Sequence, residues 1–300
     1  MKPIPVLLGP TASGKTALAL EMARMFPIEI VSADAMLVYR SLDIGTAKPT
    51  QAELQAVPHH LIDIVDPQQE YDVARFVQDA EQAIADIQAR NRIPLVVGGT
   101  GFYVKALQQG LPLTPRADEA LQQQIWHELE HRGLDALLAE ISAVNPAEAQ
   151  RMQRNPRRVI RALEVQRRTG KFPGDFGYTT PRFQYRLFGL SPVFPDLEKR
   201  IALRVQQMFA AGLVHEVKSL LDVLSEDTGR RPTALQAIGY KEVLEGLSEG
   251  HSEAAMIEKI TLATRQYAKR QLTWLKTQLH AECQSIDQVR PDLLAYLQEG

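Results

Sequence analysis

The chain has 300 residues, enough for one large domain or two smaller ones with a substantial buried core. Its formal net charge of −2 excludes a uniformly basic surface, so nucleic acid would have to be held by a local basic patch. Because Cys283 is the single cysteine, an internal disulfide and a multi-cysteine zinc site are excluded. No apolar run approaches the roughly 20 residues of a membrane-spanning helix, and we expect a cytoplasmic protein without a membrane segment.

The first part of the chain alternates apolar runs with amphipathic stretches. We predict strands over Ile4–Leu8, Ile28–Ser32, Leu61–Val65 and Pro94–Val97, and helices over Lys15–Phe26 and Val73–Arg90. Strands that alternate with helices are typical of a parallel sheet with helices on its faces. The predicted fold class is therefore α/β, with a P-loop NTPase-like parallel sheet core and a helical insertion domain.

That insertion is predicted from the middle of the chain. Between Arg116 and Lys171 the residues are polar, rich in Gln and Arg and interrupted by prolines, and a strand pattern returns at Tyr185–Leu190. The economical interpretation is an insertion between two strands of one sheet. We therefore predict a core domain of residues 1–113 and 184–300 and a helical insertion domain of residues 114–183.

The stretch "LLGPTASGKT" matches the phosphate-loop pattern G-x-x-x-x-G-K-[ST], after a predicted strand and before a predicted helix. In such loops, backbone N–H groups, the helix N-terminus and a mobile lysine together bind phosphate. The Thr16 hydroxyl is in the position that coordinates phosphate-bound Mg²⁺, so Mg²⁺ is the expected cofactor. The predicted anion-binding residues are Gly9, Pro10, Thr11, Ala12, Ser13, Gly14, Lys15 and Thr16.

Two polar residues follow other predicted strands. Asp34 lies beyond the carboxyl end of one strand, where open α/β sheets bind ligands. Its position is compatible with three roles: a Mg²⁺ ligand, a general base, or only a helix cap. Thr100 follows two glycines and is a substrate contact, a cap of the helix starting at Gly101, or both. The Walker B strand of an ATPase does not appear, because "IPLVVGGT" ends in Gly-Gly-Thr, and no arginine- and glycine-rich lid follows. Phosphate binding is therefore better supported than phosphoryl transfer.

The predicted insertion holds a concentrated basic stretch. Arg151–Lys171, "RMQRNPRRVIRALEVQRRTGK", has eight basic residues and one acidic residue in 21 positions. Such a run is either a solvated face paired with acidic neighbours or a patch for a phosphate backbone, and its low acid content favours nucleic acid. The residues expected to share much of one helix face are Arg154, Arg157, Arg158 and Arg161.

The C-terminal part of the chain, Asp196–His280, is predicted to be helical, with a last long helix over Ser252–Leu279. Tyr267 and Trp274 on this helix are either stacking platforms for bases or core residues, and we favour the core for Tyr267. The helix also carries the basic residues Arg265, Lys269, Arg270 and Lys276.

Together these stretches resemble the tRNA dimethylallyltransferase (tRNA isopentenyltransferase) family, in its bacterial form without a zinc finger. The pieces "DIGTAKP", "GGTGFY" and "AKRQxTW" are not general features of phosphate loops, so the resemblance is specific. The matching pieces occur in family order: "GPTASGKT" (9–16), "SADAMLVYRSLDIGTAKP" (32–49), "HHLIDIVDP" (59–67), "IPLVVGGTGFYVKAL" (93–107), "NPRRVIRALEV" (155–165), "MFAAGLVHEV" (208–217), "QAIGYKE" (236–242) and "TRQYAKRQLTWL" (264–275).

The resemblance implies transfer of a dimethylallyl group from dimethylallyl diphosphate to N6 of adenine 37 in tRNA, giving N6-(dimethylallyl)adenosine and diphosphate. The phosphate loop would then hold the diphosphate of the donor, with Mg²⁺. This accounts for the missing Walker B strand, because no γ-phosphoryl group is transferred. The chain is expected to act as a monomer. The basic insertion is expected to bind the anticodon stem-loop.

The resemblance also implies roles for single residues. Asp34 corresponds to the acid that takes the N6 proton, Thr100 to a threonine near the reacting base, and Arg204 to an arginine on the diphosphate. The implied catalytic residues are Asp34, Thr100, Lys15 and Arg204. The implied tRNA-binding residues are Asp34, Ala35, Met36, Leu37, Thr100, Gln122, Arg157, Arg158, Val159, Ile160, Arg161, Gln236, Ala237, Ile238, Gly239, Tyr240, Lys241, Lys269, Arg270, Trp274 and Lys276.

Three of these residues depart from the family pattern. Ala35 and Leu37 replace the common Ser and Gln, which removes two polar contacts, and Gln122 stands where a basic residue is common. The departures weaken individual tRNA contacts and leave the implied chemistry intact.

Three other functions compete with this interpretation. A small-molecule kinase would need ATP turnover and a lid, and it leaves the basic insertion unexplained. An enzyme that prenylates free AMP, ADP or ATP has no use for that insertion. A non-enzymatic RNA-binding protein would not need the intact Lys15, Thr16 and Asp34.

Overall fold

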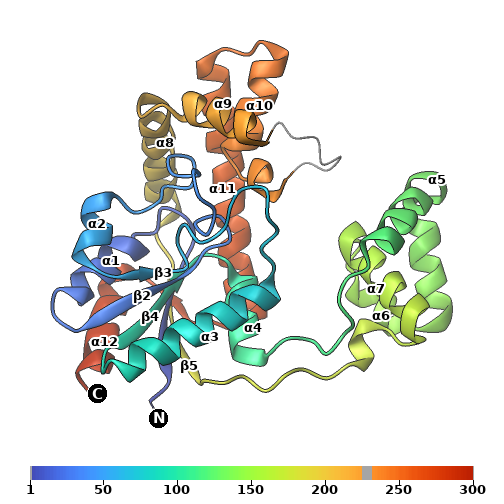
Figure 1. Ribbon diagram of the computed structural model, residues 1–300, viewed down its shortest axis with the longest axis horizontal. Helices are drawn as coiled ribbons and strands as arrows, with labels where there is room; N and C mark the ends of the chain where they lie inside the picture. The colour runs from blue at the N-terminus through green and yellow to red at the C-terminus, as the bar shows by residue number, and fades with distance from the viewer. Residues whose placement is uncertain (1, 225–231, 300) are drawn as a thin grey trace. The chain divides into compact units, whose positions relative to one another are not determined.

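The computed structural model describes residues 2–224 and 232–299, and the chain divides into two units (Figure 1). One unit is formed by Met1–Gln108 and Arg182–Gly300, and the other by Gln109–Pro181. The second unit therefore begins a few residues before the predicted insertion, 114–183, and ends slightly before it.

A six-stranded parallel sheet forms the centre of the first unit. The strand order is β3-β2-β4-β1-β5-β6, and every pair of neighbours is parallel. The middle strands are largely buried and mostly apolar, as expected for strands covered on both faces, although β2 also carries the buried Glu29 and Ser32. The predicted α/β fold class is confirmed. The strands are β1 (Ile4–Leu8), β2 (Ile28–Ala33), β3 (His59–His60), β4 (Ile93–Gly98), β5 (Tyr185–Leu190) and β6 (Cys283–Gln284).

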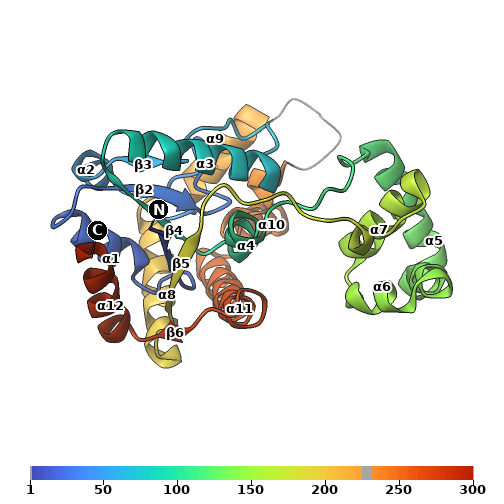
Figure 2. The ribbon, with the colours of Figure 1, turned by 90° about the horizontal axis from the view of Figure 1, so that it is seen from below.

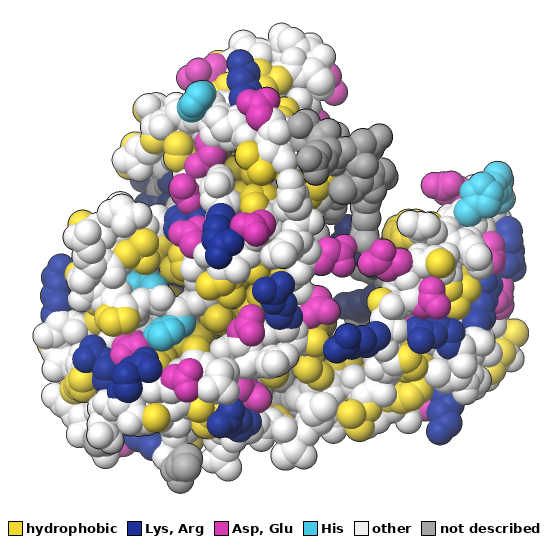
Figure 3. Space-filling model, in the orientation of Figure 1, with side chains coloured by type: hydrophobic (Ala, Val, Ile, Leu, Met, Phe, Trp, Pro, Cys, Tyr) yellow, Lys and Arg dark blue, Asp and Glu magenta, His cyan; other side chains and the backbone are white. Residues whose placement is uncertain are grey.

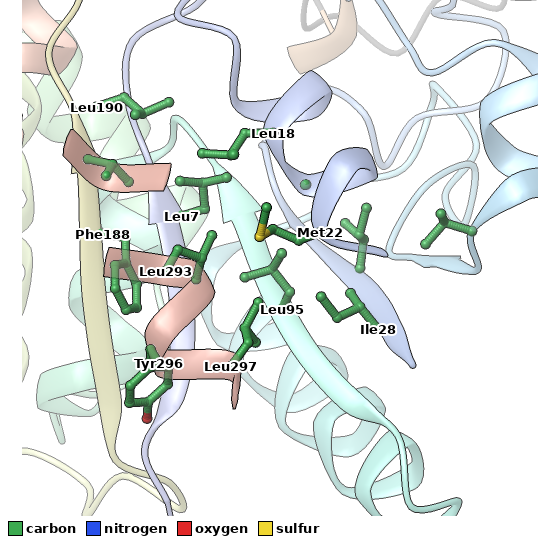
Figure 4. Close-up of a cluster of buried hydrophobic side chains, with 14 residues drawn as sticks. Leu7, Leu18, Met22, Ile28, Leu95, Phe188, Leu190, Leu293, Tyr296 and Leu297 are labelled. Carbon is green, nitrogen blue, oxygen red and sulfur yellow. The ribbon is translucent and has the colours of Figure 1, made fainter. Parts of the chain in front are cut away.

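Helices cover both faces of this sheet (Figure 2). α1 (Lys15–Ala23) and α12 (Ile286–Gln298) pack on one face, and α3 (Val73–Ala89) packs on the other. Figure 4 shows how side chains of α1 and α12 meet those of the strands in one buried cluster. The cluster includes Leu7, Leu18, Met22, Ile28, Leu95, Phe188, Leu293, Tyr296 and Leu297.

The remaining helices of this unit follow the ends of the strands. α8 packs against α9 and α11, and α10 packs against α11. The predicted last long helix, Ser252–Leu279, is confirmed by α11. The helices are α2 (Gln51–Ala56), α4 (Gly101–Gln109), α8 (Phe194–Ala210), α9 (Leu213–Leu224), α10 (Tyr240–Glu249) and α11 (Glu253–Gln278), with a 3₁₀ turn, η2 (Thr233–Gln236).

The second unit is helical, as predicted. It consists of α5 (Glu119–Val144), α6 (Pro146–Arg151), α7 (Pro156–Thr169) and a 3₁₀ turn, η1 (Pro173–Asp175). The asparagine before α6 and the one before α7 each accept a backbone hydrogen bond, and a proline then opens each helix. The prolines that interrupt the sequence pattern therefore start helices. The core of the unit includes Ile125, Leu137, Ile141, Val159, Ile160 and Leu163.

Two sequence-based expectations about the sheet are wrong or incomplete. The predicted strand Leu61–Val65 does not form, because the β3 strand is His59–His60 and the backbone of Leu61 and Asp63 has positive φ. Val65 forms only an isolated bridge with Tyr39. The edge strand β6 and the helix α12 were not predicted.

Candidate active site

The phosphate loop connects the buried strand β1 to helix α1, as its sequence predicts. Gly14 has φ 94°, a left-handed conformation that glycine adopts without strain. No side chain caps α1, so the N–H groups of its first turn are available to an anion. The Lys15 ammonium folds back over the loop and donates to the carbonyls of Gly9 and Pro10, at 2.9 and 2.7 Å.

A cavity of about 630 Å³ opens over this loop, a size that suits a small-molecule ligand. Its polar part includes loop residues 11–16, Asp34, Arg204 and Arg270. The rest is largely apolar. The apolar lining residues include Met36, Leu37, Ile201, Val205, Met208, Ile238 and Ile260.

Two cations in the cavity have little to neutralise them. Burial lowers the pKa of Lys15 to about 8, with Asp34 opposing this shift and Arg204 adding to it. Burial, and then Arg200, also lower the pKa of Arg204, although a guanidinium stays protonated. The Arg204 side chain has no hydrogen bond or ion pair with any residue in 2–224 or 232–299. Two such cations beside free N–H groups form a site for a multiply charged anion.

Asp34 and Thr100 lie together at the carboxyl ends of β2 and β4. One Asp34 carboxylate oxygen accepts the N–H of Met36 at 2.9 Å, and the other has no partner in the described part of the chain. The Thr100 hydroxyl accepts the N–H of Ala35 at 3.0 Å. Thr100 therefore holds the segment that carries Asp34, and its hydroxyl proton stays free to donate to a ligand.

Buried hydroxyl groups add to the polar part of the cavity. Ser13, in the loop, and Ser32, on β2, both line the cavity and are 3% exposed. Within the described residues, neither hydroxyl oxygen has a hydrogen-bond partner. A buried hydroxyl without a partner carries a desolvation cost that a bound polar ligand would offset.

Sequence reasoning missed Gln271, on α11. Its side chain is 7% exposed, lines the cavity and hydrogen-bonds both to the phosphate loop and to the segment before Thr100. The available signal was helical spacing, because Gln271 lies four residues after Tyr267 and so on the same helix face. Tyr267 also lines the cavity, where burial, reinforced by Asp34, raises its pKa to about 12.

The cavity also gathers several of the residues implied to bind tRNA. Met36, Leu37 and the segment 236–238 line it. Tyr240, by contrast, is fully buried, and its hydroxyl donates to Glu216 at 2.6 Å, so its side chain belongs to the core rather than to a binding surface. Lys269, Arg270 and Lys276 are exposed on α11.

The basic stretch of the second unit is less segregated than its sequence indicates. Arg154 precedes helix α7 and pairs with Asp135 at 2.5 Å, so the expected four-arginine helix face does not form. Figure 3 shows acidic and basic side chains intermingled on the visible face of this unit. Other arginines of the stretch pair with acids as well: Arg151 with Glu148, Arg161 and Arg168 with Glu164, and Arg167 with Glu128 and Glu140.

Other residues of this stretch also differ from expectation. The side chains of Val159 and Ile160 are buried in the core of the unit, so they cannot contact a ligand. Gln122 donates to the buried carboxylate of Glu164 at 2.7 Å. Among the described residues, Arg157 has no carboxylate partner, and Arg158 bonds to the Gln153 side chain and the Arg151 carbonyl.

Two features commonly sought in such a chain are absent from its described part. Residues 2–224 and 232–299 contain no group of three or more His, Cys, Asp or Glu side chains placed to hold a metal ion. None of the described helices is both long and apolar enough to cross a bilayer.

Known proteins resemble this chain over nearly its whole length. Residues 37–278 match the IPP transferase family, and residues 2–66 match the isopentenyl transferase family. A tRNA dimethylallyltransferase from Deinococcus radiodurans is 55% identical over 99% of this chain and 97% of its own length. One from Thermus thermophilus is 50% identical over 92% of this chain and 90% of its own.

Solved structures resemble the fold as well. The full-length tRNA isopentenylpyrophosphate transferase from Bacillus halodurans has a TM-score of 0.71 and 35% identity, with 100% of this chain and 98% of that chain covered. A eukaryotic dimethylallyltransferase, studied as it acts on tRNA, has a TM-score of 0.75 and 30% identity, with 93% of this chain and 71% of that chain covered.

Proposed function

This chain belongs to the IPP transferase family, and we propose on that basis that it transfers a dimethylallyl group from dimethylallyl diphosphate to N6 of adenine 37 in tRNA, releasing diphosphate. The observation that carries the proposal is one cavity that combines an anion-binding loop and the unpaired Arg204 with the carboxylate of Asp34. The apolar part of this cavity suits a five-carbon prenyl chain.

The diphosphate of the donor is bound by the loop. Its oxygens accept hydrogen bonds from the N–H groups at the start of α1, and Lys15 and Arg204 neutralise its charge. The same groups stabilise the negative charge that develops when the allylic C–O bond breaks. The prenyl chain then lies against side chains such as Met208 and Ile238.

The residues present fit Mg²⁺ as a cofactor. Mg²⁺ usually takes one or two protein oxygens and completes its shell with phosphate oxygens and water, so it needs no cage of carboxylates. The Thr16 hydroxyl, exposed in the first turn of α1 and lining the cavity, would hold it. When bound, the ion neutralises part of the leaving diphosphate.

The acceptor is handled by Asp34 and Thr100. N6 of adenine is a weak nucleophile, so it has to be held in line with C1 of the donor. As the N6–C1 bond forms and the C1–O bond breaks, the free oxygen of Asp34 takes the N6 proton and the diphosphate leaves with the electron pair. Thr100 supports this geometry by holding the backbone next to Asp34.

Binding of tRNA is proposed to use exposed cations in both units. In the first unit these are Lys269, Arg270 and Lys276 on α11, and in the second Arg157 and Arg158. Their contacts with the phosphate backbone help offset the few kcal/mol needed to unstack adenine 37. The chain is expected to act as a monomer in the cytoplasm, where its tRNA substrate is found.

The test is an incubation of the protein with dimethylallyl diphosphate labelled in the prenyl group, Mg²⁺ and either unmodified tRNA or AMP. We expect label in tRNA, at adenine 37 after nuclease digestion, and none in AMP. Label in AMP alone would identify a nucleotide prenyltransferase instead. Consumption of ATP with no prenylated product would overturn the proposal in favour of a kinase.

A further inference from the structure

Gln271 is a buried polar residue whose amide makes two long-range hydrogen bonds, one at its oxygen and one at its nitrogen. Its side-chain oxygen accepts the N–H of Thr11 at 2.9 Å, and its side-chain nitrogen donates to the carbonyl of Gly99, also at 2.9 Å. A buried amide is costly unless it is hydrogen-bonded, and here both ends are satisfied. The two bonds also determine which end of the amide faces each segment.

These contacts join two segments with different proposed tasks. Thr11 lies in the loop that binds the diphosphate, and Gly99 immediately precedes Thr100, which holds the backbone beside Asp34. One side chain of α11 therefore connects the donor part of the cavity to its acceptor part. Because the Thr11 N–H is occupied by Gln271, it is not among the amides left for the diphosphate.

Close packing around Gly99 accompanies this connection. A Cβ atom at position 99 would lie 2.4 Å from the Gln271 side-chain nitrogen and 3.3 Å from the carbonyl oxygen of Gly9. Only glycine lets the Gln271 amide, the phosphate loop and this segment approach so closely.

We propose that Gln271 is a positioning residue that sets the separation between the diphosphate loop and the Asp34–Thr100 segment, so that C1 of the donor lies in line with N6 of the acceptor. This inference rests on the proposed function. A displacement of about 1 Å at the reacting atoms can cost about 100-fold in rate, whereas binding of each substrate alone depends little on their mutual alignment.

The variant Gln271→Met keeps a side chain of similar length and removes both hydrogen bonds. We expect the single-turnover rate at saturating donor and tRNA to fall about 10- to 100-fold. The dissociation constants of dimethylallyl diphosphate and of tRNA, each measured alone, should stay within about threefold of the wild type. The matched control is Gln266→Met, at an exposed position of the same helix, which should leave the rate unchanged.

A second variant covers the possibility that Gln271→Met does not fold. Gly99→Ala keeps the amide of Gln271 but places a methyl group against it, and Gly99 does not have positive φ, so alanine fits the backbone there. It should lower the same single-turnover rate without weakening binding of either substrate.

The outcomes separate this inference from the proposed function. A wild-type protein that makes no prenylated tRNA would refute the function itself. An active wild type with both variants within about threefold of its rate would overturn the positioning role alone. A loss of rate that follows weaker donor binding or a lower melting temperature would assign Gln271 a purely structural role and also overturn the proposal.

Discussion

At the scale of single residues, this cavity depends on charges held away from their usual neutralising partners. Lys15 bonds only to backbone carbonyls among the described residues, Arg204 has no partner there, and one oxygen of Asp34 is free. Each group therefore remains available to bind a ligand. Leaving it without a partner lowers the stability of the free protein.

The first concerns proton removal by Asp34. Asp34→Asn keeps the hydrogen bond to the Met36 N–H but cannot accept the N6 proton, so the single-turnover rate should fall about 10²- to 10⁴-fold with tRNA affinity unchanged. Glu53→Gln, at another carboxylate that lines the cavity, is the matched control and should stay close to wild type. A rate for the Asp34→Asn variant within about tenfold of wild type would contradict the general-base role.

The second concerns pH and the charge of Lys15. Burial lowers the pKa of Lys15 to about 8, and an anion binds the protonated form, so donor affinity should be high below pH 8 and weaken above it. Because one proton is linked to binding, the dissociation constant should rise by at most about tenfold per pH unit. Titrations of dimethylallyl diphosphate between about pH 7 and 9.5 check this. Lys15→Arg stays charged throughout and should give a flatter profile, and equal slopes for the two proteins would assign the effect elsewhere.

At the scale of elements, the segment after β2 depends on one carboxylate for its shape. Glu216, on α9, accepts the N–H groups of Asp43, Ile44 and Gly45 at 2.8–3.1 Å, as well as the hydroxyl of Tyr240. Gly45 and its neighbours 46 and 47 line the cavity. Helix α9, which has no residue among those lining the cavity, therefore shapes one wall of it.

The variant Glu216→Gln should make residues 43–47 less ordered. The amide keeps one acceptor oxygen and brings a donor toward backbone N–H groups, so we expect the free energy of unfolding to fall by about 1–3 kcal/mol. Hydrogen exchange of residues 43–47 should accelerate more than that of the sheet. Tyr240→Phe removes only the hydroxyl and should leave exchange of 43–47 nearly unchanged. If the Glu216→Gln variant protects this segment as well as the wild type does, the carboxylate is not what orders it.

At the scale of the whole molecule, the chain combines the unit that carries the cavity with a helical unit rich in arginine. Much of the positive charge of that helical unit is neutralised internally, with the 0% exposed Glu164 carboxylate holding both Arg161 and Arg168. Arg161 also donates to the carbonyl of Pro115, which ties the start of the unit to α7. The arginines therefore divide into those that build the unit and those left for a ligand.

This division predicts different effects within one basic stretch. Arg157→Ala and Arg158→Ala should weaken tRNA binding, and each lost phosphate contact should reduce the slope of log K against log [salt] by about one. Arg154→Ala, which breaks the exposed pair with Asp135, should change the slope less. Fluorescence titrations at three salt concentrations distinguish these results. Equal slopes for wild type and the Arg157 and Arg158 variants would show that the stretch is only a solvated helix face.

The sequence predicted the regular elements well where a local pattern decides them. The strands Ile4–Leu8 and Tyr185–Leu190, the phosphate loop and the helix α3 follow from apolar periodicity and turn chemistry within a few residues. The predicted strand at Leu61–Val65 failed because positive φ at Leu61 and Asp63 bends an apolar run that looks continuous. The helix α12 packs its apolar face against β1 and β5, and no motif marks it.

Short motifs in the sequence were enough to identify the family, the phosphate loop and the candidate residues Lys15, Asp34 and Thr100. Only the tertiary structure decided which groups are free and which are paired. Arg161 pairs with Glu164, and Gln271 bonds to residues 172 and 260 positions away in the sequence. A local sequence pattern does not encode either contact. Local periodicity carries no information about such contacts, since they arise from how the sheet and its helices pack.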